Sequence, residues 1–150
     1  MPRRYSSVGD QTIASPTDTV LTIQAPTTVR PEIFEFSVGF DAPADNQIRI
    51  TVQAFDTDDG TGTGVTPTSL DNGDPASLCT VQDNHTTEPS SYTAGEILYD
   101  SFVNQRGLLR WVAVPGAEWR LAAVATEGVG WLPIHASSTD DVVVTLYHAE

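Results

Sequence analysis

Lysine is absent from this sequence, and all seven basic residues are arginines. They stand against 20 aspartates and glutamates, which leaves a formal net charge of −13 at pH 7. Nucleic acids and anionic membrane surfaces are bound by clustered cations, so we expect neither of them as a partner. The same negative charge favours solubility and makes free copies of the chain repel one another.

Cysteine is nearly absent too, since Cys79 stands alone and an intrachain disulfide is excluded. A secreted disulfide scaffold is therefore a poor interpretation. No run approaches the roughly 18 apolar residues of a membrane-spanning helix. The basic start at Arg3 and Arg4 is not followed by the apolar run of a signal peptide. We expect the chain to be made in a cytoplasm.

Helical periodicity is missing as well, and strand-like alternation takes its place. The clearest case is the stretch 30–40, which predicts a half-buried antiparallel strand. Its apolar side is expected to hold Phe34, Phe36, Val38 and Phe40. A second alternating stretch, 47–55, follows a turn at 41–46 and predicts the partner strand of a hairpin.

Eight or nine such strands, separated by turn signals, predict an all-β fold: an antiparallel β-sandwich of jelly-roll type. We expect one domain over residues 19–150, with long loops at 56–75 and 83–94. Residues 1–18 are polar and predict a flexible, extended N-terminal arm. The arm could simply fray, or it could order on a neighbouring surface. In the second case its anchors would be Arg3, Arg4 and Tyr5.

The predicted strand 107–114 is unusual because it carries Arg110 and Trp111 within an apolar run. Alternation places Leu108, Arg110, Val112 and Val114 on one side, with Leu109, Trp111 and Ala113 on the other. We interpret one side as core and the other as a contact with another subunit. The candidate interface residues are Arg106, Arg110, Trp111 and Arg120. Intrachain pairing of these arginines with carboxylates is the alternative.

Catalytic motifs are not found. His85, His135 and His148 lack metal-ligand spacing, and nothing next to Cys79 in the sequence would activate it as a nucleophile. The acidic loop 56–64 resembles the start of a calcium loop, but its glycine comes one place early and Pro67 stands where the final glutamate belongs. We read it as a solvated loop, with an adventitious cation site as the alternative. We therefore expect no enzyme activity, no cofactor and no metal.

Several stretches together resemble a family of small virion proteins of tailed phages, the head decoration or cement proteins. The resemblance covers most of residues 19–148 and depends on the order and spacing of its segments. These are Leu21–Pro31, Glu35–Phe40, Thr63–Pro67, Leu70–Asp71, Asp74–Pro75, His85–Pro89, Asn104–Arg106, Arg110–Ala113 and Pro115–Gly116. Residues 122–126 and 131–133 depart from the pattern.

The resemblance implies a non-enzymatic β-sandwich that binds the outer surface of a phage head as a homotrimer and stabilises it. Its partners would be the major capsid protein and copies of itself, and its location the virion. Two alternatives stay open: another phage head or tail structural protein, or a carbohydrate-binding jelly roll. The second would use aromatic side chains such as Trp111, Trp119 and Trp131 as a sugar platform.

Overall fold

A computed structural model describes residues 2–15, 17–41, 45–90, 92–134 and 141–150. Among these residues there are twelve strands and no helix. The strands are β1 (Arg4–Thr12), β2 (Leu21–Gln24), β3 (Glu32–Asp41), β4 (Gln47–Phe55), β5 (Thr61–Val65), β6 (Thr68–Ser69), β7 (Thr80–Thr87), β8 (Tyr92–Asn104), β9 (Leu109–Val112), β10 (Trp119–Arg120), β11 (Gly128–Ile134) and β12 (Asp141–Ala149).

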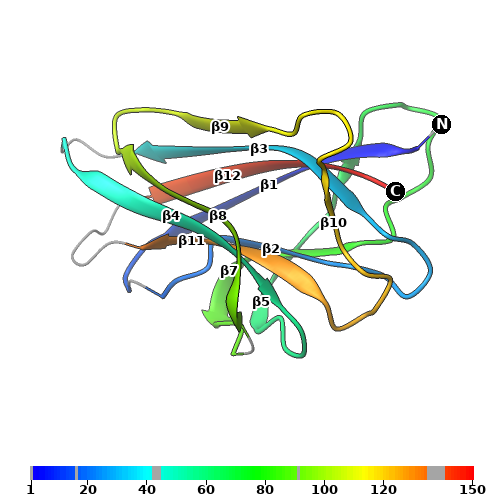
Figure 1. Ribbon diagram of the computed structural model, residues 1–150, viewed down its shortest axis with the longest axis horizontal. Helices are drawn as coiled ribbons and strands as arrows, with labels where there is room; N and C mark the ends of the chain where they lie inside the picture. Colours follow the sequence, from blue (N-terminus) through cyan, green and yellow to red (C-terminus); the bar gives the residue numbers. More distant parts are fainter. Residues whose placement is uncertain (1, 16, 42–44, 91, 135–140) are drawn as a thin grey trace.

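The strands form two antiparallel sheets that pack face to face. The first has the order β10-β3-β12-β1-β6, and β9 also pairs with β3. The second has the order β5-β7-β2-β11-β4-β8. Figure 1 shows β9, β3, β12 and β1 in an upper layer, with β11, β2, β7 and β5 below them. The predicted all-β sandwich is confirmed.

The pairing between strands is nested. β1 pairs with β12, β2 with β11, β3 with β9 and β4 with β8, and successive pairs belong to alternate sheets. A long hairpin folded over on itself gives this order, which is that of a jelly roll. The remaining strands, β5, β6, β7 and β10, extend the two sheets at their edges.

The core lies between the sheets and is aromatic at its centre. The Phe36 ring on β3 lies 5.5 Å from that of Trp111, 5.7 Å from that of Trp119 and 5.8 Å from that of Trp131. Aliphatic side chains from β4 and β12 fill the space around them, as alternation along each strand predicts. Trp131, on the central strand β11, is fully buried.

The predicted flexible arm is wrong for the part that forms β1. Residues 4–12 pair in continuous register with β12, from Arg4 opposite Ala149 to Thr12 opposite Asp141. The inward side chains are Tyr5, Ser7 and Gly9, so two of the three are too small to contribute much apolar burial. The ladder of backbone hydrogen bonds holds this segment, and composition carries no signal for that.

The predicted hairpin between 30–40 and 47–55 is also wrong. β3 lies in the first sheet, between β12 and the edge strands, whereas β4 lies in the second sheet between β11 and β8. The chain crosses from one layer to the other between them. Alternation reports which side of a strand is apolar, and both strands would show the same pattern in either sheet.

The strict alternation predicted for β3 breaks near its start. Ile33 is fully buried and Phe34 is not, whereas further along Phe36 and Val38 point inward. The register between β3 and β12 shifts at Tyr147 and His148, which is the mark of a β-bulge. The bulge turns Phe34 outward, where its ring lies 6.2 Å from that of Tyr147.

The long loops predicted at 56–75 and 83–94 are shorter in the structure. β5 and β6 lie within the first of them, and β7 runs through Thr87. β7 pairs with both β2 and β5, which continues the second sheet beyond the jelly-roll strands. The strand count exceeds the predicted eight or nine because β1, in the predicted arm, and β5 and β6, in the predicted loop 56–75, also pair as strands.

Candidate functional site

The outward row of the 107–114 stretch lies open on the first sheet, with the alternation that the sequence predicts. Leu109 and Trp111 face the core, while Leu108, Val112 and Val114 are 69%, 51% and 72% exposed. Leu108 lies over Gly39 of the neighbouring strand β3, where a Cβ would be 3.7 Å from its Cδ1 atom. Large aliphatic side chains are thus displayed on the outward side of a paired sheet.

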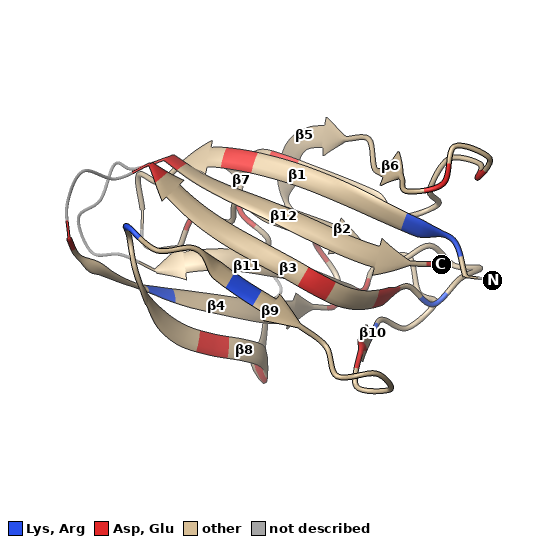
Figure 2. Ribbon diagram, turned by 90° about the horizontal axis from the view of Figure 1, so that it is seen from above, with Lys and Arg blue, Asp and Glu red and all other residues tan. Residues whose placement is uncertain are grey.

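The same face continues across β12 and β1 through Val143 and Val8, which are also exposed. Register places Val143 opposite Gly39 on β3, and Val8 opposite Thr145 on β12. We call this surface the outer face; it comprises Val8, Leu108, Val112, Val114 and Val143. Figure 2 looks onto this sheet: β12 is almost wholly uncharged along its length, whereas β9, β3 and β1 each carry charged positions.

A second exposed apolar area lies on β8, the edge strand of the other sheet. Ile97, Leu98 and Phe102 are 44%, 38% and 68% exposed; we call these three the β8 patch. Together the outer face and the β8 patch hold eight of the eleven exposed large hydrophobic residues among those described. The exposed apolar side chains therefore gather in two areas, one on each sheet, and each area also holds an ion pair: Arg110 with Glu35 on the outer face, and Arg49 with Asp100 at β8.

Two of the candidate interface arginines pair within the chain. Arg110 Nε lies 2.7 Å from Glu35 Oε1 on the outer face, and Arg120 Nε lies 2.8 Å from Glu32 Oε1. Both side chains thus have a carboxylate partner within the chain, as the intrachain alternative expects, and their role in a contact between subunits stays a prediction. Both pairs are largely exposed, so each contributes little to stability.

The other two candidates lie elsewhere. Trp111 points inward and stacks on Trp119, with ring centroids 4.1 Å apart, so it belongs to the edge of the core. Arg106 lies in the turn between β8 and β9, where its backbone N–H donates to Asn104 Oδ1 at 2.8 Å. The structure does not bring the four candidate interface residues together as one surface.

The three predicted arm anchors are tied to the chain's own sheet. Arg3 and Glu150 exchange two backbone hydrogen bonds, of 3.0 and 2.9 Å. The Arg4 guanidinium lies over the Phe34 ring, 5.7 Å from its centroid. Tyr5 is fully buried and its hydroxyl donates to the Pro75 carbonyl at 3.0 Å. Tyr5 is thus a core residue in this structure.

The tryptophans do not form a sugar platform. Trp131 has no exposed surface, and Trp111 and Trp119 stack face to face against the core. A sugar would need an exposed ring face, so these three residues give no support to the carbohydrate-binding alternative. His135, the histidine that follows β11, lies outside the described residues.

The acidic loop at 56–64 uses its carboxylates to fold itself. Asp58 accepts hydrogen bonds from the Gly60 N–H at 3.0 Å and from Ser90 Oγ at 2.7 Å. The hydrogen bond from Ser90, followed by that from Gly60, lowers the pKa of Asp58. Asp59 accepts from Gln82 Nε2 on β7 at 2.8 Å. These contacts pin the loop against β7.

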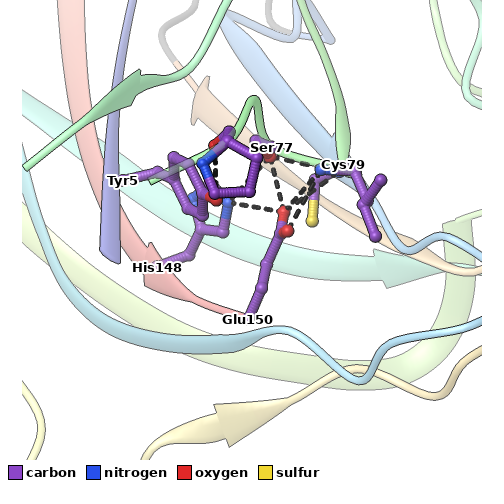
Figure 3. A network of polar contacts seen from close by, with 7 residues as sticks. Tyr5, Ser77, Cys79, His148 and Glu150 are labelled. Atoms are coloured by element: carbon purple, nitrogen blue, oxygen red, sulfur yellow. Dashed lines mark hydrogen bonds and ion pairs between the residues drawn. The ribbon is translucent and has the colours of Figure 1, made fainter. Parts of the chain in front are cut away.

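A buried polar cluster, which the sequence did not indicate, lies where β12 ends (Figure 3). Its members are Ser77, Cys79, His148 and Glu150. The Glu150 carboxylate accepts hydrogen bonds from Ser77 Oγ at 2.5 Å and from the N–H groups of Leu78 and Cys79 at 3.0 and 3.1 Å. His148 Nε2 lies 3.5 Å from the same oxygen, Oε1.

The hydrogen bonds in the cluster stabilise the ionised form of the Glu150 carboxylate. Burial alone would raise the pKa of Glu150, but contacts with His148, Ser77 and the Leu78 N–H outweigh it and lower the pKa to about 2. Burial, and then the neighbouring Glu150, raise the pKa of the Cys79 thiol. Cys79 is therefore not an activated nucleophile, because nucleophilic cysteines need a lowered pKa.

The cluster is not arranged as a serine triad either. In a triad the base lies between nucleophile and acid, with one ring nitrogen toward each. Here Ser77 Oγ and Glu150 Oε1 both face Nε2 of His148, at 3.4 and 3.5 Å. Nδ1 of His148 is buried and has no hydrogen-bond partner among the described residues. Acyl transfer would need a different orientation of the ring.

A second buried histidine, His85, is held in a polar network on the other sheet. Its Nδ1 lies 3.0 Å from the Thr19 carbonyl, so Nδ1 carries the proton and donates it. Nε2 then accepts from Thr22 Oγ1 at 3.3 Å. Burial lowers the pKa of His85 below its ordinary value of 6.5, although the Thr19 carbonyl, Asp59 and Asp83 act in the opposite direction. The buried site therefore favours the neutral form of the His85 ring.

Because His85 binds a proton less readily when folded, we expect the stability of the chain to fall as the pH drops below about 6.5. Below that pH the unfolded chain takes up a proton that the folded chain refuses. In His85→Gln this part of the pH profile should flatten. Urea-unfolding midpoints between about pH 5 and pH 8 would measure both profiles.

Two nearby acids do not obscure this test. Burial raises the pKa values of Asp83 and Glu88. These two acids therefore make the chain more stable as the pH drops, which is opposite to the effect of His85, and they do so in a lower pH range. The difference between the wild-type and His85→Gln profiles isolates the histidine. Parallel profiles would show that His85 titrates alike in the folded and unfolded chain.

Comparison with protein-family models, with curated proteins and with solved structures finds no match for this chain. Among the described residues there is also no helix that could cross a membrane. The class of protein that fold and surface define is a jelly-roll β-sandwich with two exposed apolar areas. The resemblance to decoration proteins stays a prediction.

Proposed function

We propose that this chain is a structural virion protein: a capsid decoration, or cement, protein that binds the outside of a phage head as a homotrimer. The observation that supports this most is the outer face, a broad sheet surface with exposed aliphatic side chains. Exposed apolar side chains that gather on one face of a sheet are typical of sites of association. The resemblance in the sequence supports the virion class.

A ring of three copies needs two different surfaces on each copy, because every contact joins one surface to the other. The outer face and the β8 patch supply two such surfaces. We assign the trimer contact to the outer face of one copy against the β8 patch of the next. Like-charged copies approach most easily where net charge is small, and on the outer face Arg110 and Glu35 neutralise each other.

The mechanism of stabilisation would be mass action. A protein that binds the assembled lattice and not the free capsid subunit stabilises the lattice by its binding free energy. Strong negative charge keeps the free chain soluble before assembly. Each trimer adds three copies of every capsid contact, and contacts held together in this way reinforce one another.

The assembly contact can be tested by placing a carboxylate at its centre. Leu108→Asp on the outer face and Phe102→Asp in the β8 patch should each raise the trimer dissociation constant by at least about 100-fold, because an unpaired buried charge costs several kcal/mol. The measurement is solution mass by light scattering, with the wild type near three times 16.1 kDa. Leu70→Asp, an exposed leucine outside both surfaces, is the matched control.

Mixing the two variants sharpens the test. A Leu108→Asp copy keeps its β8 patch and a Phe102→Asp copy keeps its outer face, so one intact contact remains and a mixed dimer should form. A face that met its own copy across a two-fold axis would not be rescued by mixing. A wild type that stays monomeric, and that fails to bind heads assembled from the major capsid protein of the same genome, would refute the proposed function.

A further inference from the structure

The cluster at the end of β12 brings together three side chains of the kinds that bind zinc. Cys79 Sγ, a ring nitrogen of His148 and a carboxylate oxygen of Glu150 all lie within 4.8 Å of one another. It is the one such group of three found among the described residues. Zinc sites in proteins are built from cysteine, histidine and carboxylate ligands.

From this arrangement we propose that Cys79, His148 and Glu150 form a binding site for a divalent zinc-type ion. Neighbouring ligand atoms in a tetrahedral zinc site are about 3.3–3.8 Å apart, given bonds of about 2.0–2.3 Å. His148 Nε2 and Glu150 Oε1 are already 3.5 Å apart. Cys79 Sγ lies within 4.8 Å of both atoms, so a small closure would complete a three-ligand site.

The burial of the ligands distinguishes this group from a surface cluster of acids. Cys79 is 7% exposed, and the side chains of His148 and Glu150 are 0% and 2% exposed. Ser77 Oγ lies 3.4 Å from His148 Nε2 and donates to Glu150 Oε1 at 2.5 Å, which is closer than two ligands of one zinc ion, so Ser77 would remain a hydrogen-bond donor to the site. Water can take the fourth position, as it does beside three protein ligands in other zinc sites.

The local charges favour a cation. The Glu150 carboxylate lies inside the protein, beside the Cys79 thiol and the His148 ring. A bound zinc ion would displace the thiol proton to solvent, leaving one thiolate and one carboxylate against two positive charges. The site would then be neutral.

The ligands lie close to the surface, because Leu78, between Ser77 and Cys79, is 52% exposed. Sequence spacing could not reveal the site, because Cys79 lies far from His148 along the chain. His148 and Glu150 are two residues apart at the end of a strand, which puts both on one side of it.

The site can be tested with cobalt, which reports its own ligands by absorption. The purified chain is stripped of metal with a chelator and titrated with Co²⁺. We expect a thiolate-to-cobalt charge-transfer band that saturates at one ion per chain and is lost when Zn²⁺ is added. Zinc at 100-fold above its dissociation constant should raise Tm by about 5–10 °C.

Two variants separate this site from weak binding by surface acids. Cys79→Ser should lose the charge-transfer band, and His148→Gln should weaken cobalt binding by at least about tenfold. His85→Gln, which removes a buried histidine elsewhere, should leave both unchanged. A wild-type chain with no charge-transfer band overturns the proposal, as does zinc binding that Cys79→Ser leaves intact. Neither outcome depends on trimer formation.

Discussion

Trp131→Ala should destabilise the fold by about 3–5 kcal/mol, the usual cost of deleting a buried tryptophan side chain. Trp131 is fully buried on β11, with Leu21 of β2 and Val52 of β4 as its registered neighbours. Its ring meets that of Phe36 at 68°, across the space between the sheets. Removing the indole ring would open a cavity in the core between the two sheets.

The matched variant is Trp131→Phe. The indole Nε1 is buried without a hydrogen-bond partner among the described residues, so phenylalanine removes a polar group that gains nothing from its position. We expect Trp131→Phe to lose less than half as much stability as Trp131→Ala. Urea unfolding followed by circular dichroism measures both. Equal losses would show that the indole N–H has a partner, and a loss below about 1 kcal/mol for Trp131→Ala would place the ring outside the core.

The pattern of the sequence predicted the layers but not the connections between them. Alternation along 108–114 correctly separated the core side, with Trp111, from the exposed side, with Leu108 and Val112. The same signal on β3 and β4 could not tell which sheet each strand joins, because a strand buried on one side looks the same in either layer. The hairpin prediction failed for that reason.

Two features depend on contacts between distant residues and therefore left no local signal. β1 is polar and rich in small residues, and it is held by its ladder to β12, at the other end of the chain. The cluster of Cys79, His148 and Glu150 likewise forms only when the segment before β7 meets the end of β12. Composition and spacing describe a segment in isolation, so both features could be found only from the paired strands.

The surfaces proposed for assembly follow from the jelly-roll order. Nesting brings β1, β12, β3 and β9 into one sheet, so exposed valines that are far apart in the sequence lie on one surface. β8 ends the other sheet, and its exposed side chains therefore form a separate area. An exposed edge strand is itself a common site of pairing between chains. The fold thus supplies both surfaces of the proposed trimer contact: the outer face of the first sheet and the edge strand β8 of the second.

Gly128→Ala should cost about 3 kcal/mol, at the upper end of what overpacking a core usually costs. Gly128 is the first residue of the buried strand β11. A Cβ there would lie 2.2 Å from Cζ of Phe55 and 2.5 Å from the carbonyl oxygen of Ile23. The ring could shift, but the oxygen belongs to β2, which pairs with β11, so relief would require the two strands to separate.

Gly64→Ala is the control for this substitution. Gly64 is also in a strand, β5, and a Cβ there would meet nothing within 4 Å. We expect its effect on stability to stay within about 0.5 kcal/mol, because the added methyl group has room and alanine restricts the unfolded chain. Thermal and urea unfolding of the two variants measure the difference. Similar losses at both positions would show that general glycine flexibility, rather than the approach of β2 and Phe55 to Gly128, sets the cost.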